Sequence, residues 1–340
     1  MLANDLGVTL SHEHLFCDGS SYFETPRTPE AMRAAQCEVS AETRDLLRRH
    51  SCVNRDNLQL DDLETAVFEA KAYRAVGGRT IVDLTGEGLG PRPEAVLQVA
   101  ERAEINVVHG CGPYCEYALS PTEVLRDVDE IAAGILTSLE DGIAGTSVRA
   151  GVIGEIGVNG QVLGESTRSC LMTPTEERGL RAAARVSLSS GAPIVVHQPN
   201  VPEATTEIVR VLESEQVPPD RVCLGHMSSV MSLDLHEAIL RRGYWIAYDN
   251  FGMELDNRFL SDTRDSRRVE WLASLLMKGL GDRILVSHDV WSKIQLQRYG
   301  GNGFTHIHRF VVPWLRQAGG ADEMIDALLV DNPQRFYAWR

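Results

Sequence analysis

Eight short apolar runs alternate with amphipathic stretches along this chain of 340 residues, and no other feature restricts its fold as strongly. Several runs are apolar almost throughout, which is typical of parallel strands buried on both faces. Leu63–Val76 and Thr175–Ser190 repeat apolar residues at helical spacing, and each stretch ends at a glycine. This alternation predicts a parallel sheet with crossover helices. The candidate strands are Gly7–Leu10, Thr80–Leu84, Asn106–His109, Gly151–Ile156, Pro193–His197, Arg221–Gly225, Tyr244–Tyr248 and Arg283–Ser287.

Such a sheet can remain open and doubly wound, or it can close into a barrel. His, Glu and Asp residues repeatedly follow the apolar runs, which is where a barrel builds its active site. We therefore expect an α/β fold, a (β/α)₈ TIM barrel, as a single domain over residues 1–340. Residues 16–60 depart most from the repeat and predict an insertion after the first strand, over the top of the barrel.

Composition excludes several kinds of partner. The formal net charge of −15 argues against nucleic acid or an anionic membrane surface as the main partner. No run approaches the 18 apolar residues of a membrane-spanning helix, and the N-terminus lacks the basic and apolar segments of a signal peptide. Seven cysteines without a regular spacing suggest reduced thiols. We expect a cytoplasmic protein that acts on a small molecule, with a homodimer as one option.

The first chemical signal is His12 and His14, which follow the apolar run Val8–Leu10. Side chains two residues apart in a strand point to the same face, so both imidazoles can face the barrel interior while Glu13 points away. Two imidazoles this close in an apolar barrel would be costly as cations and suit a shared metal ion. Taken alone, a His-x-His pair is a weak signal.

Four further polar residues follow apolar runs. His197 and His226 end successive strands, although a lone histidine there is more often a hydrogen-bonded core residue. Glu155 interrupts the apolar segment Gly151–Gly157, where an unpaired carboxylate is costly to bury. A salt bridge to an inward arginine would resolve that cost, as would ligation of two cations. Asp289 follows the last strand and can ligate a metal ion, whereas the adjacent His288 is expected to support the site from behind.

This pattern resembles the phosphotriesterase family of the amidohydrolase superfamily over essentially the whole chain. The name-giving phosphotriesterases bridge their metals with a carboxylated lysine on strand four. None of the three lysines of this chain, Lys71, Lys278 and Lys293, lies there, and Glu155 takes that place. The resemblance is therefore closest to the glutamate-bridged, phosphotriesterase-related branch. The runs that carry it are Gly7–Leu15, Thr173–Glu177, Arg221–His226, Tyr248–Glu254, His288–Lys293, Tyr299–Ile307 and Asn332–Pro333.

The resemblance implies two divalent metal ions per chain, zinc or alternatively manganese or cobalt. One ion would take His12, His14 and Asp289, and the other would take His197 and His226. Glu155 would bridge them together with a hydroxide. Metal binding lowers the pKa of water to about 7 and so supplies a nucleophile at neutral pH. Asp289 would be the catalytic residue that accepts the proton of the attacking water.

The loops after the strands are expected to select the substrate. Lys293 and Arg298 would either contact an acidic group of the substrate or remain as solvated charges. The implied activity is hydrolysis of a carboxylic amide, ester or lactone. An organophosphate triesterase is the alternative, and a non-catalytic protein that binds a small molecule on the same fold is a third reading. The candidate substrate-binding residues are Tyr114, Phe251, Glu254, Trp291, Lys293 and Arg298.

Overall fold

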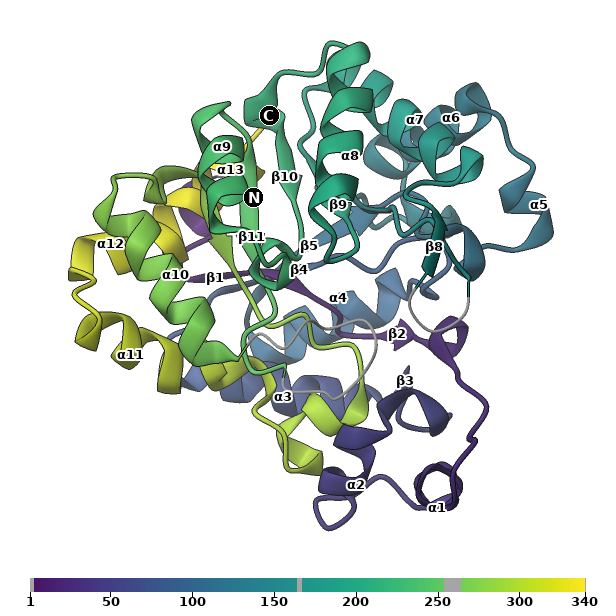
Figure 1. Cartoon of the computed structure of the whole chain (residues 1–340), viewed down its shortest axis with the longest axis vertical. Helices are drawn as coiled ribbons and strands as arrows, with labels where there is room; N and C mark the ends of the chain where they lie inside the picture. Colours follow the sequence, from purple (N-terminus) through teal and green to yellow (C-terminus); the bar gives the residue numbers. More distant parts are fainter. Residues whose placement is uncertain (1–2, 164–166, 254–263, 340) are drawn as a thin grey trace.

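The computed structural model describes residues 3–163, 167–253 and 264–339. Eight parallel strands pair in the order β1-β4-β5-β6-β9-β10-β11-β12 and form a nearly closed barrel surrounded by helices (Figure 1). The predicted barrel is confirmed, and each predicted strand overlaps an observed one. The strands are β1 (Thr9–Glu13), β4 (Thr80–Asp83), β5 (Asn106–Cys111), β6 (Val152–Gly157), β9 (Ile194–His197), β10 (Val222–Leu224), β11 (Trp245–Tyr248) and β12 (Ile284–Val286).

The helices begin at local capping signals. Asp62 accepts hydrogen bonds from the first turn of α3, and Thr173 forms a capping box with Glu176 at α7. Gly191 ends α7 in the left-handed conformation that glycine tolerates best. The helices on the barrel are α3 (Leu63–Ala75), α4 (Pro93–Ala103), α5 (Pro121–Val124), α6 (Val128–Glu140), α7 (Pro174–Ser190), α8 (Pro202–Ser214), α9 (Leu233–Arg241), α10 (Asp265–Met277), α11 (Val312–Gln317), α12 (Asp322–Asp326) and α13 (Asn332–Tyr337).

Side chains alternate between the barrel interior and the helix layer. The interior cluster contains Leu6, Val82, Leu84, Val108, Val152, Val195, Cys223, Trp245, Ala247, Leu285, Phe336 and Tyr337. Leu6, Phe336 and Tyr337 come from the two ends of the chain, where α13 packs against the short helix Ala3–Asp5 (Figure 1). The Tyr337 hydroxyl donates to the Ser11 carbonyl at 2.8 Å. The two chain ends thus close the N-terminal mouth of the barrel, and the other mouth is left for function.

A buried carboxylate holds β1 against the end of β12. Both oxygens of Glu13 point away from the barrel interior and accept hydrogen bonds from residues 287–290. The donors are the Ser287 hydroxyl at 2.8 Å, the His288 amide at 2.9 Å and ring at 2.6 Å, and the Val290 amide at 3.0 Å. His288 therefore helps to hold β1 against the end of β12. Its side chain points away from the barrel interior, as the alternation of side chains along a strand predicts.

Residues 17–60 interrupt the strand–helix repeat. β2 (Cys17–Asp18) pairs antiparallel with β3 (Gln59–Leu60), and the chain between them forms α1 (Pro29–Gln36) and α2 (Arg44–Arg49), set away from the strands in Figure 1. An ion pair and a hydrogen bond connect this segment to the loop after β12. Lys293 pairs with Asp56 at 2.6 Å, and the Ile294 amide donates to the Asn57 side chain at 3.0 Å.

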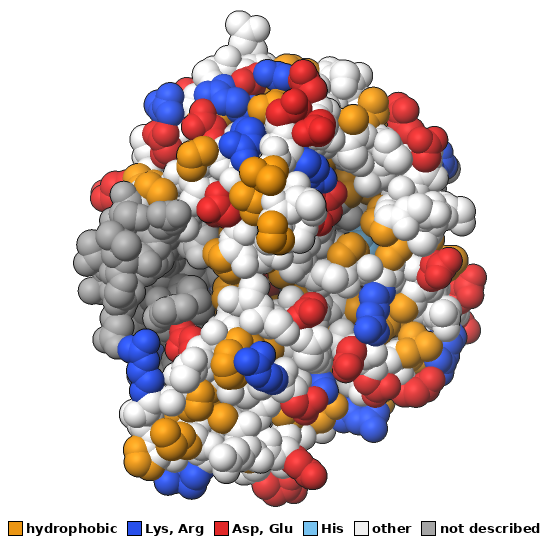
Figure 2. Space-filling view, turned by 90° about the vertical axis from the view of Figure 1, so that its right-hand side faces the viewer, with side chains coloured by type: hydrophobic (Ala, Val, Ile, Leu, Met, Phe, Trp, Pro, Cys, Tyr) orange, Lys and Arg blue, Asp and Glu red, His pale blue; other side chains and the backbone are white. Residues whose placement is uncertain are grey.

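The surface carries mixed charge. On the face drawn in Figure 2, basic side chains are scattered among acidic ones. Among the described residues, no helix is long and apolar enough to cross a membrane.

Candidate active site

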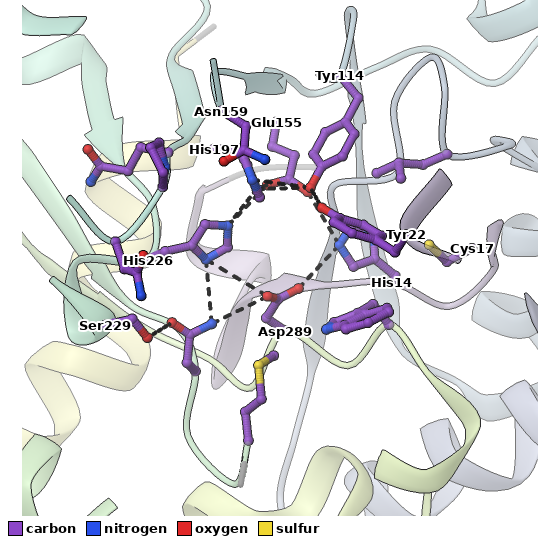
Figure 3. Close-up of a pocket in the computed structure, with 17 residues that line it drawn as sticks. His14, Cys17, Tyr22, Tyr114, Glu155, Asn159, His197, His226, Ser229 and Asp289 are labelled. Carbon is purple, nitrogen blue, oxygen red and sulfur yellow. Dashed lines mark hydrogen bonds and ion pairs between the residues drawn. The ribbon is translucent and has the colours of Figure 1, made fainter. Parts of the chain in front are cut away.

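The C-terminal ends of five strands bring together the six residues that the sequence pattern selected, and Figure 3 labels all of them except His12. His12 and His14 lie on or just after β1, and Glu155 lies on β6. His197 ends β9, while His226 and Asp289 lie beyond β10 and β12. His197 is partly buried, and the other five are at least nine-tenths buried. Residues up to 277 positions apart in the chain thus form one polar cluster at one end of the barrel.

Glu155 lies at the centre of this cluster. Its Oε1 is 3.5 Å from His14 Nε2, and its Oε2 is 3.4 Å from His12 Nε2. The same Oε2 is 3.1 Å from His197 Nδ1 and 3.5 Å from His226 Nε2. One carboxylate therefore lies within 3.5 Å of four imidazole nitrogens, three of them at Oε2 and one at Oε1.

Asp289 completes the side that holds His12 and His14. Its Oδ1 is 3.4 Å from His14 Nε2 and 3.8 Å from His12 Nε2. Its Oδ2 accepts a hydrogen bond from the Asn250 amide at 3.3 Å. Asp289 and His226 both have a φ of +55°, which is uncommon for residues with a side chain and often marks functional positions.

Neighbouring side chains fix which imidazole nitrogen faces Glu155. Asp249 Oδ2 accepts from His12 Nδ1 at 2.8 Å, and Asp249 Oδ1 lies 3.3 Å from His226 Nδ1. Thr85 Oγ1 donates to a carbonyl at 3.0 Å and accepts from His14 Nδ1 at 2.9 Å. When these three rings are neutral, their lone pairs are therefore at Nε2 and face the centre of the cluster.

Burial and neighbouring charges shift the pKa values of the cluster in opposite directions. Burial lowers the pKa of each imidazole, but hydrogen bonds that His14 donates to Asp289 and Glu155 raise the pKa of His14 to about 9. Against the same effect of burial, the charge of Asp249 raises the pKa of His226 to about 10. Burial would raise the pKa of Glu155, yet the charges of His12 and His197 hold it well below its usual range. A bound cation would displace the protons of these imidazoles, because a ligating nitrogen must be deprotonated.

Close backbone packing explains the glycines around Glu155. A side chain at Gly110 on β5 would come within 2.0 Å of the Gly154 carbonyl oxygen, and one at Gly157 would come within 2.1 Å of the Cys115 amide nitrogen. Only glycine allows the strands to approach this closely. The glycines around Glu155 thus allow the backbone to pack closely where the carboxylate lies deep in the barrel.

The donor set suits a metal ion. Two groups, His12-His14-Glu155 and Glu155-His197-His226, each offer ligand atoms that lie within 4.8 Å of one another. His12 Nε2 is buried without a hydrogen-bond partner among the described residues, which is costly for a polar atom unless a cation meets it. Asp249 also lies near His12 and His226, but its oxygens are occupied by hydrogen bonds to both rings.

A cavity of about 770 Å³, measured with its solvent-open mouth, lies over the cluster. Its walls differ on the two sides of the histidines. Tyr22, Tyr114 and Cys17 lie on the His14 side, and Ser229 lies beyond His226 (Figure 3). The remaining lining residues include Leu89, Met253, Trp291, Pro199, Asn159, Gln198, Asn200 and Asn250.

Comparison with known proteins identifies the family. A sequence model described as the Phosphotriesterase family matches residues 1–337.

The chain belongs to the phosphotriesterase family.

Phosphotriesterase-family relatives cover nearly the whole chain. An N-acetyltaurine hydrolase of Dictyostelium discoideum is 30% identical over 362 residues, with 98% of this chain and 94% of the relative covered. The crystal structure of a resiniferatoxin-binding protein from Rhodobacter sphaeroides is 34% identical, with a TM-score of 0.93 over 99% of this chain and 92% of that one. A phosphotriesterase homology protein from Escherichia coli, complexed with phosphate in its active site, is 26% identical, with a TM-score of 0.79 over 98% and 99%.

Membership of this family makes the chain a metal-dependent hydrolase. The relatives named as hydrolases act on small molecules. The cluster at the open mouth of the barrel is the part of the described structure that offers metal ligands from several strands.

The expected substrate-binding residues fall into three groups. Tyr114 and Trp291 line the cavity. Phe251, Lys293 and Arg298 do not: Phe251 is 1% exposed within the main core, and the two cations lie beside the carboxylates of Asp56 and Asp62. Glu254 lies outside the described residues.

Sequence reasoning missed Asp249 and Tyr22. Asp249 lies two residues beyond the interior residue Ala247 and therefore shares its face of β11. The same rule places His197 beyond Val195, so this signal was present in the sequence. Tyr22 follows Cys17 in the segment between β2 and α1, and no local sequence pattern marks it as a residue of the cavity wall.

Changing Asp249 to asparagine is expected to weaken metal binding by about 10–100-fold without unfolding the protein. The amide can accept through only one atom, so His12 or His226 loses its orientation. Competition with a chelator measures the affinity. Asp265→Asn is the matched control, because Asp265 is also buried and bonded to a histidine, at 2.6 Å from His306 Nε2, outside the cluster. An unchanged affinity in Asp249→Asn would contradict the orienting role.

Proposed function

We propose that this chain hydrolyses a carboxylic amide, ester or lactone at a centre of two divalent ions, zinc or alternatively manganese or cobalt. The observation that carries the proposal is the convergence of four imidazole nitrogens on the Glu155 carboxylate, each within 3.5 Å of one of its oxygens. His12, His14 and Asp289 would hold one ion. His197 and His226 would hold the other, and Glu155 would contact both.

Two ions so placed would lower the pKa of a shared water to about 7, supplying hydroxide, and would polarise the substrate carbonyl. Asp289 has one oxygen toward His12 and His14 and the other toward Asn250. It can accept the proton of the attacking water and pass it to the leaving group. Asp249 and Thr85 hold three imidazoles with their lone pairs toward the centre. The cavity walls orient the substrate over this group.

Relatives support a carbonyl substrate. The N-acetyltaurine hydrolases are named for cleavage of an amide, and one of them is 30% identical to this chain. The second candidate is an organophosphate triesterase, favoured by the phosphate in the active site of the Escherichia coli relative. The third is a binding protein, favoured by the name of the Rhodobacter sphaeroides relative. We prefer hydrolysis because simple binding does not need six converging ligands.

Purified protein is expected to hold about two divalent ions per chain, because the cluster offers two ligand groups that share Glu155. Elemental analysis measures the content, and a screen of amides, esters, lactones and phosphotriesters then tests the loaded protein. Turnover of a carbonyl compound supports the proposal. Turnover of triesters alone would favour the second candidate, and absence of metal after reconstitution would favour the binding protein.

We also propose that residues 16–60 and the barrel act as one domain. The segment supplies Cys17 and Tyr22 to the cavity wall and is tied to the loop after β12 by the Lys293–Asp56 pair. Substrate selection would then depend on residues 16–60 as well as on the barrel.

A further inference from the structure

We propose, on the basis of the proposed function, that the substrate is uncharged and carries an apolar, preferably aromatic, group that packs against Tyr22, Tyr114 and Trp291. The same cavity would discriminate against substrates with a sulfonate or carboxylate. Three features lead to this proposal: a wall of aromatic rings, the uncharged polar side chains of the lining, and the pairing of Lys293 and Arg298 with carboxylates outside the cavity lining.

The aromatic wall is continuous. The centre of the Tyr22 ring lies 5.2 Å from that of Trp291 and 6.4 Å from that of Tyr114, and the Tyr22 and Tyr114 hydroxyls are hydrogen-bonded to each other. The Tyr114 hydroxyl is also 3.1 Å from His197 Nδ1, so the wall begins at the cluster itself. Rings at these separations offer faces and edges for another ring. A flat apolar group next to the scissile bond would thus gain contacts.

Uncharged polar side chains make up another part of the cavity lining: Asn159, Gln198, Asn200, Ser229 and Asn250. Gln198 donates to the Gly225 carbonyl at 2.8 Å and accepts from Thr205 at 2.8 Å, so this amide is already engaged within the protein. Neutral amides orient a substrate through hydrogen bonds and provide no counter-charge for an anion.

Lys293 and Arg298, the two cations expected to meet the substrate, pair with carboxylates outside the cavity lining. Among the described residues that line the cavity, none is a lysine or an arginine. Lys293 Nζ lies 2.6 Å from Asp56 and 3.8 Å from Asp61, and the Arg298 guanidinium lies 3.9 Å from Asp62. The charges of Glu155, Asp249, Asp289 and a hydroxide would balance those of two divalent ions. An anionic substrate group would therefore lose its hydration in this cavity without gaining a partner.

A matched pair of amides tests the proposal. N-acetyltaurine and N-acetyl-2-phenylethylamine share the acetamide and the two-carbon spacer, and they differ only in a terminal sulfonate or phenyl group. For metal-loaded protein we expect kcat/KM to be about 100-fold higher for the phenyl compound. The corresponding acetate esters should show the same order. Equal or faster hydrolysis of the sulfonates would overturn the proposal.

Binding separates this proposal from the proposed function. In metal-loaded Asp289→Asn protein, with turnover slowed, calorimetry should show tighter binding of the phenyl amide than of N-acetyltaurine. If wild-type protein hydrolyses neither the amides nor the esters but the phenyl amide still binds more tightly, the proposed hydrolysis is wrong and the selectivity stands. Tighter binding of N-acetyltaurine would overturn the selectivity, whatever the activity.

Substitutions in the wall locate the preference. Tyr22→Ala should remove most of the preference for phenyl, whereas Tyr22→Phe should retain it because the ring remains. Trp291→Leu provides a second truncation of the wall in case Tyr22→Ala folds poorly. A preference that survives both Tyr22→Ala and Trp291→Leu would overturn the assignment of this wall.

Discussion

Replacing Glu155 with glutamine is expected to remove at least one of the two metal ions and to lower turnover by at least about 100-fold. The effect should exceed the 10–100-fold typical of a residue that only orients a ligand, because the Glu155 carboxylate lies within 3.5 Å of all four imidazoles. A neutral amide is a poor substitute for an anion between two cations. Elemental analysis and steady-state kinetics of the variant measure the two losses.

Two comparisons isolate the role of Glu155. Glu69→Gln is the matched control, because Glu69 is a fully buried glutamate on α3, outside the cavity wall. That variant should retain wild-type metal content. Apo wild-type protein should reload with metal equally well with and without bicarbonate, because glutamate needs no carboxylation. A strict requirement for bicarbonate, or full metal content in Glu155→Gln, would contradict the bridging role.

Asp289→Asn is expected to lower kcat by about 10²–10⁴-fold, because the amide cannot accept the proton of the attacking water. The fold should persist, since the backbone of Asp289 is held by hydrogen bonds that do not involve its carboxylate. Its amide donates to the His12 carbonyl at 3.2 Å, and its carbonyl accepts from Gln295 at 3.0 Å. Steady-state kinetics at matched metal content provides the measurement.

Metal content must be determined on the same samples, because Asp289 also faces His12 and His14. Asp129→Asn, which removes an exposed aspartate on α6 that pairs with Arg185, controls for the loss of one negative charge. Turnover near the wild-type rate in fully loaded Asp289→Asn protein would show that another group accepts the proton.

The fold could be predicted because each strand is an apolar run with a polar residue at its C-terminal end. Val195 and His197 illustrate the rule: one points into the barrel, and the other points into its mouth on the same face. Helix ends carried equally local signals, such as Thr173 with Glu176 and then Gly191. Barrel closure could not be predicted from such local signals. It depends on contacts between residues far apart in sequence, here the hydrogen bonds between β1 and residues 287–290.

The rest of the site could not be predicted from local pattern because loop residues turn away from the strand direction. Lys293 and Arg298 follow the last strand in sequence, as Asp289 does, but carboxylates of residues 56–62 attract them away from the cavity. Phe251 follows β11 and packs into the core instead. Tyr22 reaches the cavity only through the tertiary placement of residues 17–60.

The four hydrogen bonds accepted by Glu13 have a consequence for how such a protein can diversify. They set the register between the first and last strands inside the wall of the barrel, without using any residue that lines the cavity. His12 and His14 from the start of the chain and Asp289 from its end are thereby aligned independently of the loops above them. Evolution can exchange those loops, and with them the substrate, while the inherited catalytic geometry is preserved.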